Sequence, residues 1–432
     1  MDSRTSSLLL CLLALMSATA VAQQSGGQIE TSPLEEAGGE SAQNTAYNSY
    51  QEDCTDCEPW RLFSQVPNGD GFNVYGWLDT GFVGNTHSPA SKFNGPYNAV
   101  DRANELMLNQ AYLVAEKTLR DDGSLGLGGR VDVIYGEDFW LAQSVGIENH
   151  DDGSSHWNSQ YYGLAVPQAY LELGRSDLSL KVGHFYSIVG YEGLPAINNF
   201  FYTKSYSYQF AGPFTHWGGL ATWKPSDSWE IQGALTNGWD TFDREPSDHL
   251  NALAKVKYTG EYGGWTSFAI VTGNDINNPG GLPIANALTN RTRYSWLVSL
   301  PVGCQTEYVF HQWLGSQEQG AIDGGTAYWY GIDQYLYHTI NDCWKTGLRF
   351  EWFRDEDGTR VGLNRPSNPN NVPFVGNFYS VAAGVNWMPT SNLTLRPEIR
   401  ADWYDGNQPV QPFNDGIDSS QLLLGVDAIL VF

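Results

Sequence analysis

The last twelve residues of the chain, Gln421-Leu-Leu-Leu-Gly-Val-Asp-Ala-Ile-Leu-Val-Phe432, alternate between two kinds of side chain. Apolar residues stand at every second position: Leu422, Leu424, Val426, Ala428, Leu430 and Phe432. The intervening face is smaller and includes Asp427. Because successive side chains of a strand point to opposite faces, this period of two predicts a β-strand. A strand that crosses a bilayer at a tilt needs about 9–11 residues, so the length fits a membrane-spanning strand.

The first residues predict export. One Arg precedes the apolar segment Leu8–Met16, and Ala20-Val-Ala22 follows in the pattern of a cleavage site. We therefore expect residues 1–22 to be a secretory signal peptide, cleaved after Ala22 or, alternatively, after Ala20. Residues 23–71 are rich in Gln, Ser, Gly and Glu and show no periodicity. This composition predicts a disordered acidic periplasmic linker, with Trp60–Phe63 as a short docking segment.

The overall composition favours an exported all-β protein. The mean hydropathy is −0.36, aromatic residues make up 14% of the chain, and there are 47 glycines. No apolar run approaches the ~18 residues of a membrane-spanning helix. The net charge of −25 argues against nucleic acid as a partner, because nucleic-acid binding needs a basic surface.

From Phe72 to Phe432 the chain divides into about sixteen strand-like segments, with 14–18 as the range. Short connections follow the even-numbered segments and long connections follow the odd-numbered ones. The short ones are 121–124, 175–177, 224–228, 259–264, 301–303, 341–343 and 389–392. This alternation with an even count predicts a transmembrane antiparallel up-and-down β-barrel over residues 72–432, with short periplasmic turns and long extracellular loops. A propeller would show a repeat per blade, and a sandwich has no reason to alternate its loop lengths.

Tryptophans gather near the ends of the predicted strands. Those beside short turns are Trp223, Trp229, Trp265, Trp344 and Trp387, and those beside long loops are Trp140, Trp313, Trp352 and Trp403. Amphipathic rings concentrate at the two membrane–water boundaries, so we interpret these residues as two aromatic girdles. The alternative is that they fill the core of a sandwich.

Several motifs resemble those of the OmpL-like β-barrel porin family over about Trp60 to Phe432. They are Tyr75-Gly-Trp-Leu-Asp79, Leu108-Asn-Gln-Ala-Tyr-Leu113, Pro167-Gln-Ala-Tyr-Leu-Glu-Leu173, Val182-Gly-His-Phe185, Gly190-Tyr-Glu192 and Gly212-Pro-Phe-Thr-His216. The resemblance implies a channel for diffusion across the bacterial outer membrane. We expect no catalytic site, no cofactor and no metal. The expected partners are outer-membrane lipid and small hydrophilic solutes and ions, and a homotrimer is left open.

If the apolar faces meet lipid, the opposite faces line the lumen. Ten of the 23 basic residues then point inward: Arg130, Lys181, Lys255, Lys257, Arg291, Arg293, Lys345, Arg349, Arg396 and Arg400. A charge facing lipid would cost about 2–4 kcal/mol at the midplane, which enforces this orientation. Two interpretations stay open: the basic residues pair across the wall, or they set ion selectivity as charged rings do in pores.

The third long loop, Ser187–Pro213, is aromatic and low in charge. It resembles the third loop of sixteen-stranded general porins, which folds into the barrel as a constriction. The hypothesis is that Glu192 lies across the pore from Arg349, Arg396 or Arg400 and creates a transverse field. The alternative is a lid packed outside.

Four cysteines remain after the signal peptide. Cys304 and Cys343 lie on two turns at the same end of the predicted barrel, and we expect a disulfide between them. For Cys54 and Cys57 a local disulfide is favoured over redox or metal chemistry. Phe432 is expected to act in barrel assembly, because the terminal strand must pair with Phe72–Val83 to close the sheet.

Three other functions fit parts of the sequence. An outer-membrane barrel enzyme of the lipase or protease type would need a nucleophile beside a base, and His184, His216, His311 and His338 have serines nearby. No spacing among them singles out such a pair. The others are a secreted carbohydrate-active protein and a plugged structural or adhesive surface barrel. Acidic residues concentrate in the long loops, where we expect solvated turns more than sites for divalent cations.

Overall fold

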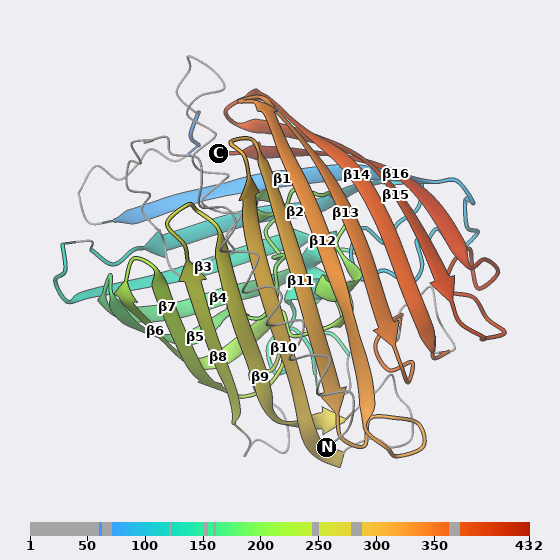
Figure 1. The fold of residues 1–432 in the computed structure, drawn as a ribbon, viewed down its shortest axis with the longest axis horizontal. Coiled ribbons are helices and arrows are strands. Elements are labelled where there is room, and N and C mark those ends of the chain that lie inside the picture. The colour runs from blue at the N-terminus through green and yellow to red at the C-terminus, as the bar shows by residue number, and fades with distance from the viewer. Residues whose placement is uncertain are drawn as a thin grey trace. The chain divides into compact units, whose positions relative to one another are not determined.

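Sixteen antiparallel strands form a closed barrel, in which each strand pairs with its neighbours in sequence and β1 pairs with β16 (Figure 1). The computed structural model describes residues 60–62, 71–120, 122–150, 154–158, 161–243, 250–277, 287–362 and 372–432. The predicted fold and strand number are confirmed. No helix within these ranges is long and apolar enough to cross a membrane.

The strands are β1 (Phe72–Asn85), β2 (Leu106–Lys117), β3 (Gly126–Gly136), β4 (Gly163–Arg175), β5 (Leu178–Tyr186), β6 (Thr215–Ser226), β7 (Trp229–Thr236), β8 (Asn251–Thr259), β9 (Trp265–Asn277), β10 (Ala287–Val302), β11 (Thr306–Gln317), β12 (Ala327–Asn341), β13 (Trp344–Asp355), β14 (Gly376–Thr390), β15 (Leu393–Asp405) and β16 (Ser420–Val431). In the described parts of the long loops there are three short helices: η1 (Glu137–Ala142), η2 (Ala196–Asn198) and α3 (Tyr206–Phe210).

The terminal strand closes the barrel in the predicted orientation. Leu78 of β1 is opposite Leu430 of β16, and Gly81 is opposite Asp427. The Gly76 amide donates to the Phe432 carbonyl at 3.0 Å, and the Phe432 amide donates back at 2.9 Å. A Cβ at Gly76 would stand 2.9 Å from the Phe432 ring and 2.3 Å from the Tyr112 carbonyl oxygen, so this close approach requires glycine. Closure leaves no unpaired edge to face lipid.

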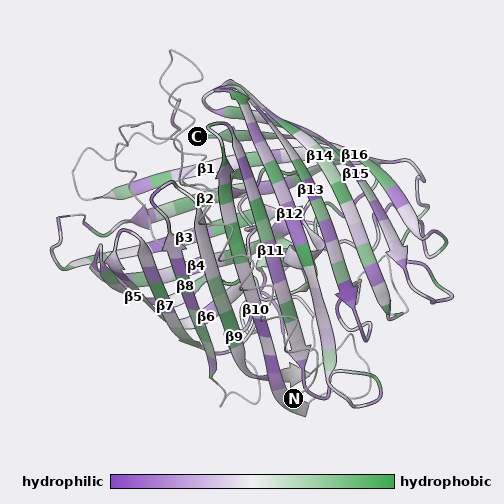
Figure 2. Ribbon diagram, in the orientation of Figure 1, coloured by the Kyte–Doolittle hydropathy of each residue, from purple (hydrophilic) through white to green (hydrophobic). Residues whose placement is uncertain are grey.

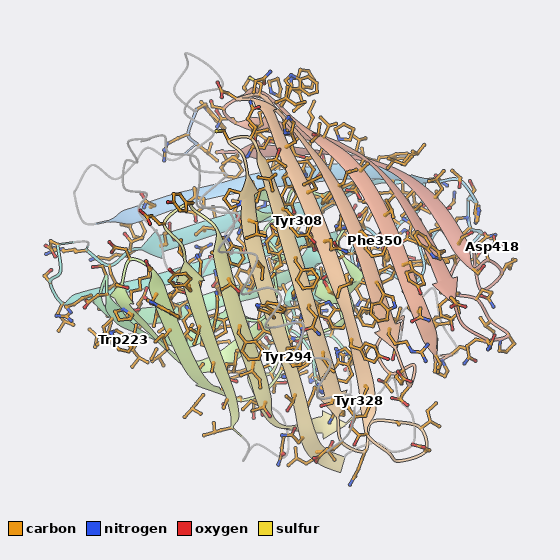
Figure 3. All side chains as sticks on the ribbon, viewed as in Figure 1. Trp223, Tyr294, Tyr308, Tyr328, Phe350 and Asp418 are labelled. Atoms are coloured by element: carbon orange, nitrogen blue, oxygen red, sulfur yellow. The ribbon has the colours of Figure 1, made fainter. Side chains whose placement is uncertain are left out.

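Side chains alternate between the outside and the inside of the wall, and hydropathy alternates with them (Figure 2). On β16, Leu422, Leu424, Val426 and Leu430 are exposed outward, whereas Asp427 is buried inside. Aromatic side chains such as Tyr294 and Phe350 project along the strands β10–β13 (Figure 3). The apolar outer surface is what a lipid environment demands.

The tryptophans follow the girdle prediction only in part. Trp223, Trp229, Trp344 and Trp387 are exposed near short turns, and Trp140 and Trp403 are exposed near long loops. Trp313 is fully buried, and its Nε1 donates to Asp333 inside the barrel at 3.3 Å. Trp265 is half-buried and stands opposite the buried Ser299. Nearness to a strand end therefore did not decide which face these two rings occupy.

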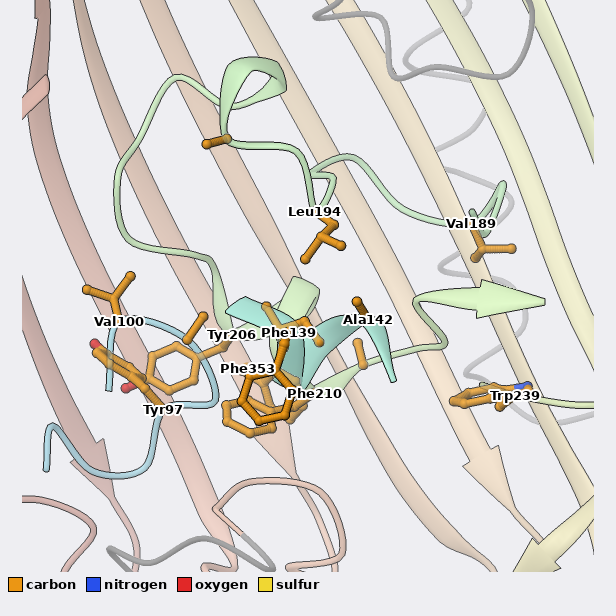
Figure 4. Close-up of a cluster of buried hydrophobic side chains, with 14 of the residues drawn as sticks. Tyr97, Val100, Phe139, Ala142, Val189, Leu194, Tyr206, Phe210, Trp239 and Phe353 are labelled. Carbon is orange, nitrogen blue, oxygen red and sulfur yellow. The ribbon is translucent and has the colours of Figure 1, made fainter. Parts of the chain in front are cut away.

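The long loops turn inward and pack together at one end of the lumen. Figure 4 shows Tyr206 and Phe210 of α3 beside Phe353 of the wall, with Tyr97 of loop L1 (between β1 and β2) against Tyr206; Phe139 of η1 belongs to the same buried cluster. Each of these five side chains is at most 3% exposed. The barrel thus holds an apolar core of its own, which positions the loops that narrow it.

Candidate functional site in the barrel lumen

The third loop L3 (between β5 and β6) lies inside the barrel. Gln110 of β2 donates to the Leu194 carbonyl at 2.8 Å and accepts from the Ala196 amide at 3.0 Å. On another part of the wall, separated from β2 by β1, β16, β15, β14 and β13, Trp329 of β12 donates to the Ala211 carbonyl of L3 at 2.9 Å. Since these wall residues point into the lumen, the loop that bonds to them must cross the lumen.

Four of the predicted basic residues lie beneath L3 and hold its backbone. They are Arg293, Arg349, Arg396 and Arg400, and each is at most 3% exposed. Every one donates to a carbonyl of the loop: to Val189 at 3.2 Å, Thr203 at 2.7 Å, Asn199 at 2.6 Å and Lys204 at 2.7 Å, respectively. A guanidinium suits this task because it presents several donors in a fixed plane.

Carboxylates compensate the arginines in the same layer. Glu192 of L3 lies 3.1 Å from Arg349, and Arg396 is paired with Asp427. Arg400 lies 2.9 Å from Asp402. Glu351 stands between Arg349 and Arg400, at 2.7 Å and 3.7 Å. Buried charges at such distances attract strongly, and each needs a partner to offset its desolvation.

The position of Glu192 differs from the transverse-field hypothesis. Its carboxylate contacts Arg349 directly, and it also accepts hydrogen bonds from the Ser205 amide at 2.8 Å and the Tyr335 hydroxyl at 3.1 Å. Only 4% of the Glu192 side chain is exposed. The acid and the arginine therefore form a contact pair that fastens L3 to the wall, in place of two charges facing each other over open water.

Arg130, Lys181, Lys255 and Lys257 lie in the half of the lumen near the short turns, whereas Arg291 lies near the long-loop end of β10, 3.2 Å from Asp275. Arg130 of β3 pairs with Asp132 at 2.7 Å and Glu116 at 3.2 Å. Lys255 of β8 lies 4.0 Å from Glu230 and keeps 19% of its side chain exposed. Lys181 and Lys257 lie over the rings of Tyr170 and Trp265, at 4.6 Å and 5.5 Å. Cation–π contacts of this kind hold a cation near an aromatic face.

Residues of the other long loops also form hydrogen bonds to L3 and to one another. The Asn98 amide of L1 donates to Gln209 at 2.7 Å, and Arg360 donates to the Phe210 carbonyl at 2.7 Å. Burial lowers the pKa of the Arg360 guanidinium to about 9. In η1, the Glu137 carboxylate accepts from the Val100 amide at 3.0 Å, and burial raises its pKa well above the usual value. L1, L2 (between β3 and β4) and L3 thus form one interlocked layer.

One constellation escaped the sequence analysis. Ser295 lies 2.8 Å from His311 Nε2, and His311 Nδ1 lies 2.9 Å from Asp333, on the neighbouring strands β10, β11 and β12. This is the connectivity of a nucleophile, a base and an orienting acid. All three residues are 1% exposed, so a substrate cannot reach Ser295 in this arrangement. Only the strand register, which brings Leu297, His311 and Asp333 into line, could have revealed the group.

The expected disulfide between Cys304 and Cys343 is not formed: both residues are thiols. They lie in the β10–β11 and β12–β13 turns, and neighbouring strands are roughly 4.8 Å apart, so the turn centres are about 10 Å apart. A disulfide needs Cα atoms within about 7 Å. Cys54 and Cys57 lie outside the described residues.

Comparison with solved structures places this architecture among outer-membrane channels. The outer-membrane protein OmpT of Vibrio cholerae matches with a TM-score of 0.53 at 12% identity, covering 85% of this chain and 100% of that one. The outer-membrane channel DcaP of Acinetobacter baumannii matches with a TM-score of 0.51 at 14% identity, covering 86% and 100%. An anion-selective porin from Comamonas acidovorans matches with a TM-score of 0.53 at 10% identity, covering 84% and 99%.

No curated protein sequence matches the chain. A family model does, and it carries the description "Putative beta-barrel porin-2, OmpL-like". The match runs over residues 71–432, which is the whole of the barrel. Together with the closed sixteen-stranded wall and the loop folded into its lumen, this match identifies the function class as a porin of the bacterial outer membrane. The chain belongs to the OmpL-like β-barrel porin-2 family.

Proposed function

We propose that the protein conducts small hydrophilic solutes and ions by passive diffusion, without catalysis, through a channel that L3 narrows. The observation that carries this proposal is the attachment of L3 inside the lumen by Arg293, Arg349, Arg396 and Arg400 of β10, β13 and β15. A sixteen-stranded barrel leaves an aqueous channel unless something fills it. Because L3 is fixed against strands within β10–β16, it reduces the cross-section of that channel. Solutes then pass along the part of the wall that L3 does not cover.

We propose that the basic residues near the short turns, Lys255 and Lys257 of β8, determine the ion selectivity of the channel. Three of the arginines under L3, Arg349, Arg396 and Arg400, are matched by Glu192, Glu351, Asp402 and Asp427, so the fields of these pairs largely cancel at a distance. Lys255 and Lys257 lie on β8, away from those pairs; Lys255 has Glu230 at 4.0 Å and retains contact with solvent. Lysines along a passing route raise the local anion concentration.

Reversal potentials in asymmetric KCl test this assignment. The double variant Lys255→Gln/Lys257→Gln is expected to shift the reversal potential toward cation selectivity, with conductance changed less. Lys117→Gln is the matched control, because Lys117 is exposed at the end of β2 on the outward-facing row. An unchanged reversal potential in the double variant would contradict the assignment to β8.

Export and attachment of the N-terminal segment complete the proposal. We infer a signal peptide over residues 1–22 and a periplasmic linker over residues 23–71. The docking prediction draws support from Trp60, whose backbone exchanges hydrogen bonds of 2.8 Å and 2.7 Å with Asn392 in the β14–β15 turn. N-terminal sequencing of the membrane-inserted protein is expected to begin at Gln23, and a start at Met1 would rule cleavage out.

A homotrimer is proposed as the assembled state. One of the matched structures, that of in-vitro folded OmpT, is described as a trimer form and has a TM-score of 0.52. Mass measurement by light scattering in detergent distinguishes one copy from three. A single copy at all detergent concentrations would contradict the proposal.

A further inference from the structure

We propose that the exposed tip of L2 binds a divalent transition-metal ion through His150 and His156. The two imidazoles face each other, with Nδ1 of His150 2.9 Å from Nε2 of His156. Their ring centroids are 3.7 Å apart, and both side chains are exposed to solvent. Imidazole nitrogen is the commonest protein ligand for such ions. The proposal goes beyond the diffusion of solutes and concerns a separate site.

The backbone holds the two histidines on opposite arms of a small hairpin. Asn149 and Ser155 form an antiparallel bridge. The His150 amide donates to the Ser154 carbonyl at 2.8 Å, and the His156 amide donates to the Glu148 carbonyl at 2.9 Å. Neighbouring residues on two paired arms are close enough for their side chains to meet. The pair is thus brought together before any ligand arrives, which lowers the entropic cost of binding.

The hairpin is anchored at its base by a buried acid. The Glu148 carboxylate accepts from the Ser144 amide at 2.8 Å and from the Val166 amide at 2.9 Å. Glu148 itself is 0% exposed. The base of L2 is therefore tied to the start of β4, so both arms project from a fixed point.

The contact between the rings is a poor hydrogen bond. A linear N–H···N bond in a common plane would separate the ring centroids by about 5 Å. The observed 3.7 Å, with an angle of 43° between the planes, requires a bent contact between overlapping rings. In this geometry, two nitrogen lone pairs can turn toward one point beside both rings.

The nitrogen separation fits a pair of adjacent metal ligands. With metal–nitrogen bonds of about 2.0–2.1 Å, two ligands at a right angle are about 2.9 Å apart, and two at the tetrahedral angle are about 3.4 Å apart. The observed nitrogen separation of 2.9 Å equals the right-angle value, the geometry of tetragonal Cu²⁺ and Ni²⁺ sites. Two rings aimed at one ion at a right angle would have centroids about 4.5 Å apart, so both imidazoles must rotate apart from the observed 3.7 Å when the ion binds. Among the described residues no group of three or more His, Cys, Asp or Glu is arranged to hold a metal, so water would complete the coordination.

The electrostatics of the protein favour a cation at this exposed loop. The chain carries 48 acidic and 23 basic residues, for a net charge of −25. A negative surface raises the local concentration of divalent cations and speeds their arrival.

Titration of the purified, tag-free full-length protein in detergent with CuCl₂ and with NiCl₂ tests the proposal. Calorimetry is expected to show one ion per chain. His150→Ala and His156→Ala are each expected to weaken binding by roughly tenfold or more, because one imidazole replaces two. His87→Ala is the control: His87 is a partly exposed loop histidine beside Asp418, at 3.1 Å, and its loss should leave the stoichiometry and affinity unchanged.

Electron paramagnetic resonance of the Cu²⁺ complex gives a second readout. Two equatorial nitrogens are expected in the natural protein and one in each single variant. Heat-modifiable gel mobility shows that the variants retain the folded barrel. Absence of stoichiometric binding, or binding that persists in the double variant His150→Ala/His156→Ala, would overturn the proposal.

Discussion

Replacing Arg349 with Met should release L3 from the barrel wall. Arg349 donates to the Thr203 carbonyl at 2.7 Å and to the Thr203 hydroxyl at 3.0 Å. It also pairs with Glu192 at 3.1 Å. Its Nε lies 2.7 Å from Glu351, at an angle too bent for a hydrogen bond, so that contact is Coulombic. Met keeps most of the side-chain length and removes every one of these interactions.

The expected loss of stability is about 3–5 kcal/mol, the usual cost of breaking a buried ion pair by removing one partner. Glu192 and Glu351 would both remain buried without this cation. Glu192→Gln is milder because the amide oxygen of the new side chain can still accept one of the two hydrogen bonds that the carboxylate takes on separate oxygens, from the Ser205 amide at Oε2 and from the Tyr335 hydroxyl at Oε1. Arg349 would keep Glu351, so we expect a loss of about 1.5–3 kcal/mol, that of one charged hydrogen bond. In the variant Arg349→Met/Glu192→Gln, the combined loss should be smaller than the sum of the two.

Two measurements check this reasoning. The temperature at which the folded gel band converts to the unfolded one reports stability. Single-channel conductance in a planar bilayer reports the width of the constriction, and it should rise and become noisier in Arg349→Met. Glu192→Gln keeps the assay informative if the Arg variant fails to assemble. Unchanged conductance and unchanged conversion temperature in both variants would refute the claim that these residues fasten L3.

Three further perturbations probe other parts of the molecule. Deleting Phe432 removes the paired backbone bonds to Gly76, so the amount of folded protein in the outer membrane should fall before channel conductance changes; normal outer-membrane levels would disprove this role. Burial raises the pKa of Asp240, in the loop after β7, to about 7. Its folded-state pKa then exceeds the unfolded value of about 3.9, so its contribution to stability is complete below about pH 4 and is lost as the pH rises toward 7. Asp240→Asn should flatten this dependence while still accepting from the Phe214 and Thr215 amides, and equal pH profiles would contradict the assignment. Cys304 and Cys343 should both react with a maleimide in folded protein without reductant, and labelling that requires reductant would restore the predicted disulfide.

The wall of the barrel could be predicted because lipid and water impose a simple pattern on it. Leu422, Leu424 and Val426 face outward, and Asp427 faces inward, as the alternation of the terminal strand indicated. The strand ends were less predictable: the alternation in the sequence predicts an end at Thr272 and a start at Thr292, whereas β9 runs to Asn277 and β10 begins at Ala287. Pairing can continue past the membrane, where the apolar alternation that marks a spanning strand is no longer required.

The sequence predicted that L3 enters the barrel, but the contacts within the lumen could not be predicted, because they join distant parts of the chain. Thr203 and Arg349 are 146 residues apart, and Asn199 and Arg396 are 197 apart. Nothing in the local sequence of β13 or β15 states which inward arginine meets a loop. The same limit hid Ser295, His311 and Asp333, whose association depends on the register of three strands.

Counting charges on inward rows therefore overstates the charge that a solute meets. Arg349, Arg396 and Arg400 all point inward, yet each is at most 3% exposed and has a carboxylate in contact. The desolvation cost of burying such an ion pair is offset only when further hydrogen bonds satisfy the remaining N–H donors. Here the carbonyl groups of L3 accept those hydrogen bonds. The arginines thus attach the loop to the wall, and the loop carbonyls replace the water that would otherwise solvate the guanidinium groups. Residues that serve this mutual attachment are poor candidates for selectivity, which falls to the side chains that L3 leaves in contact with water.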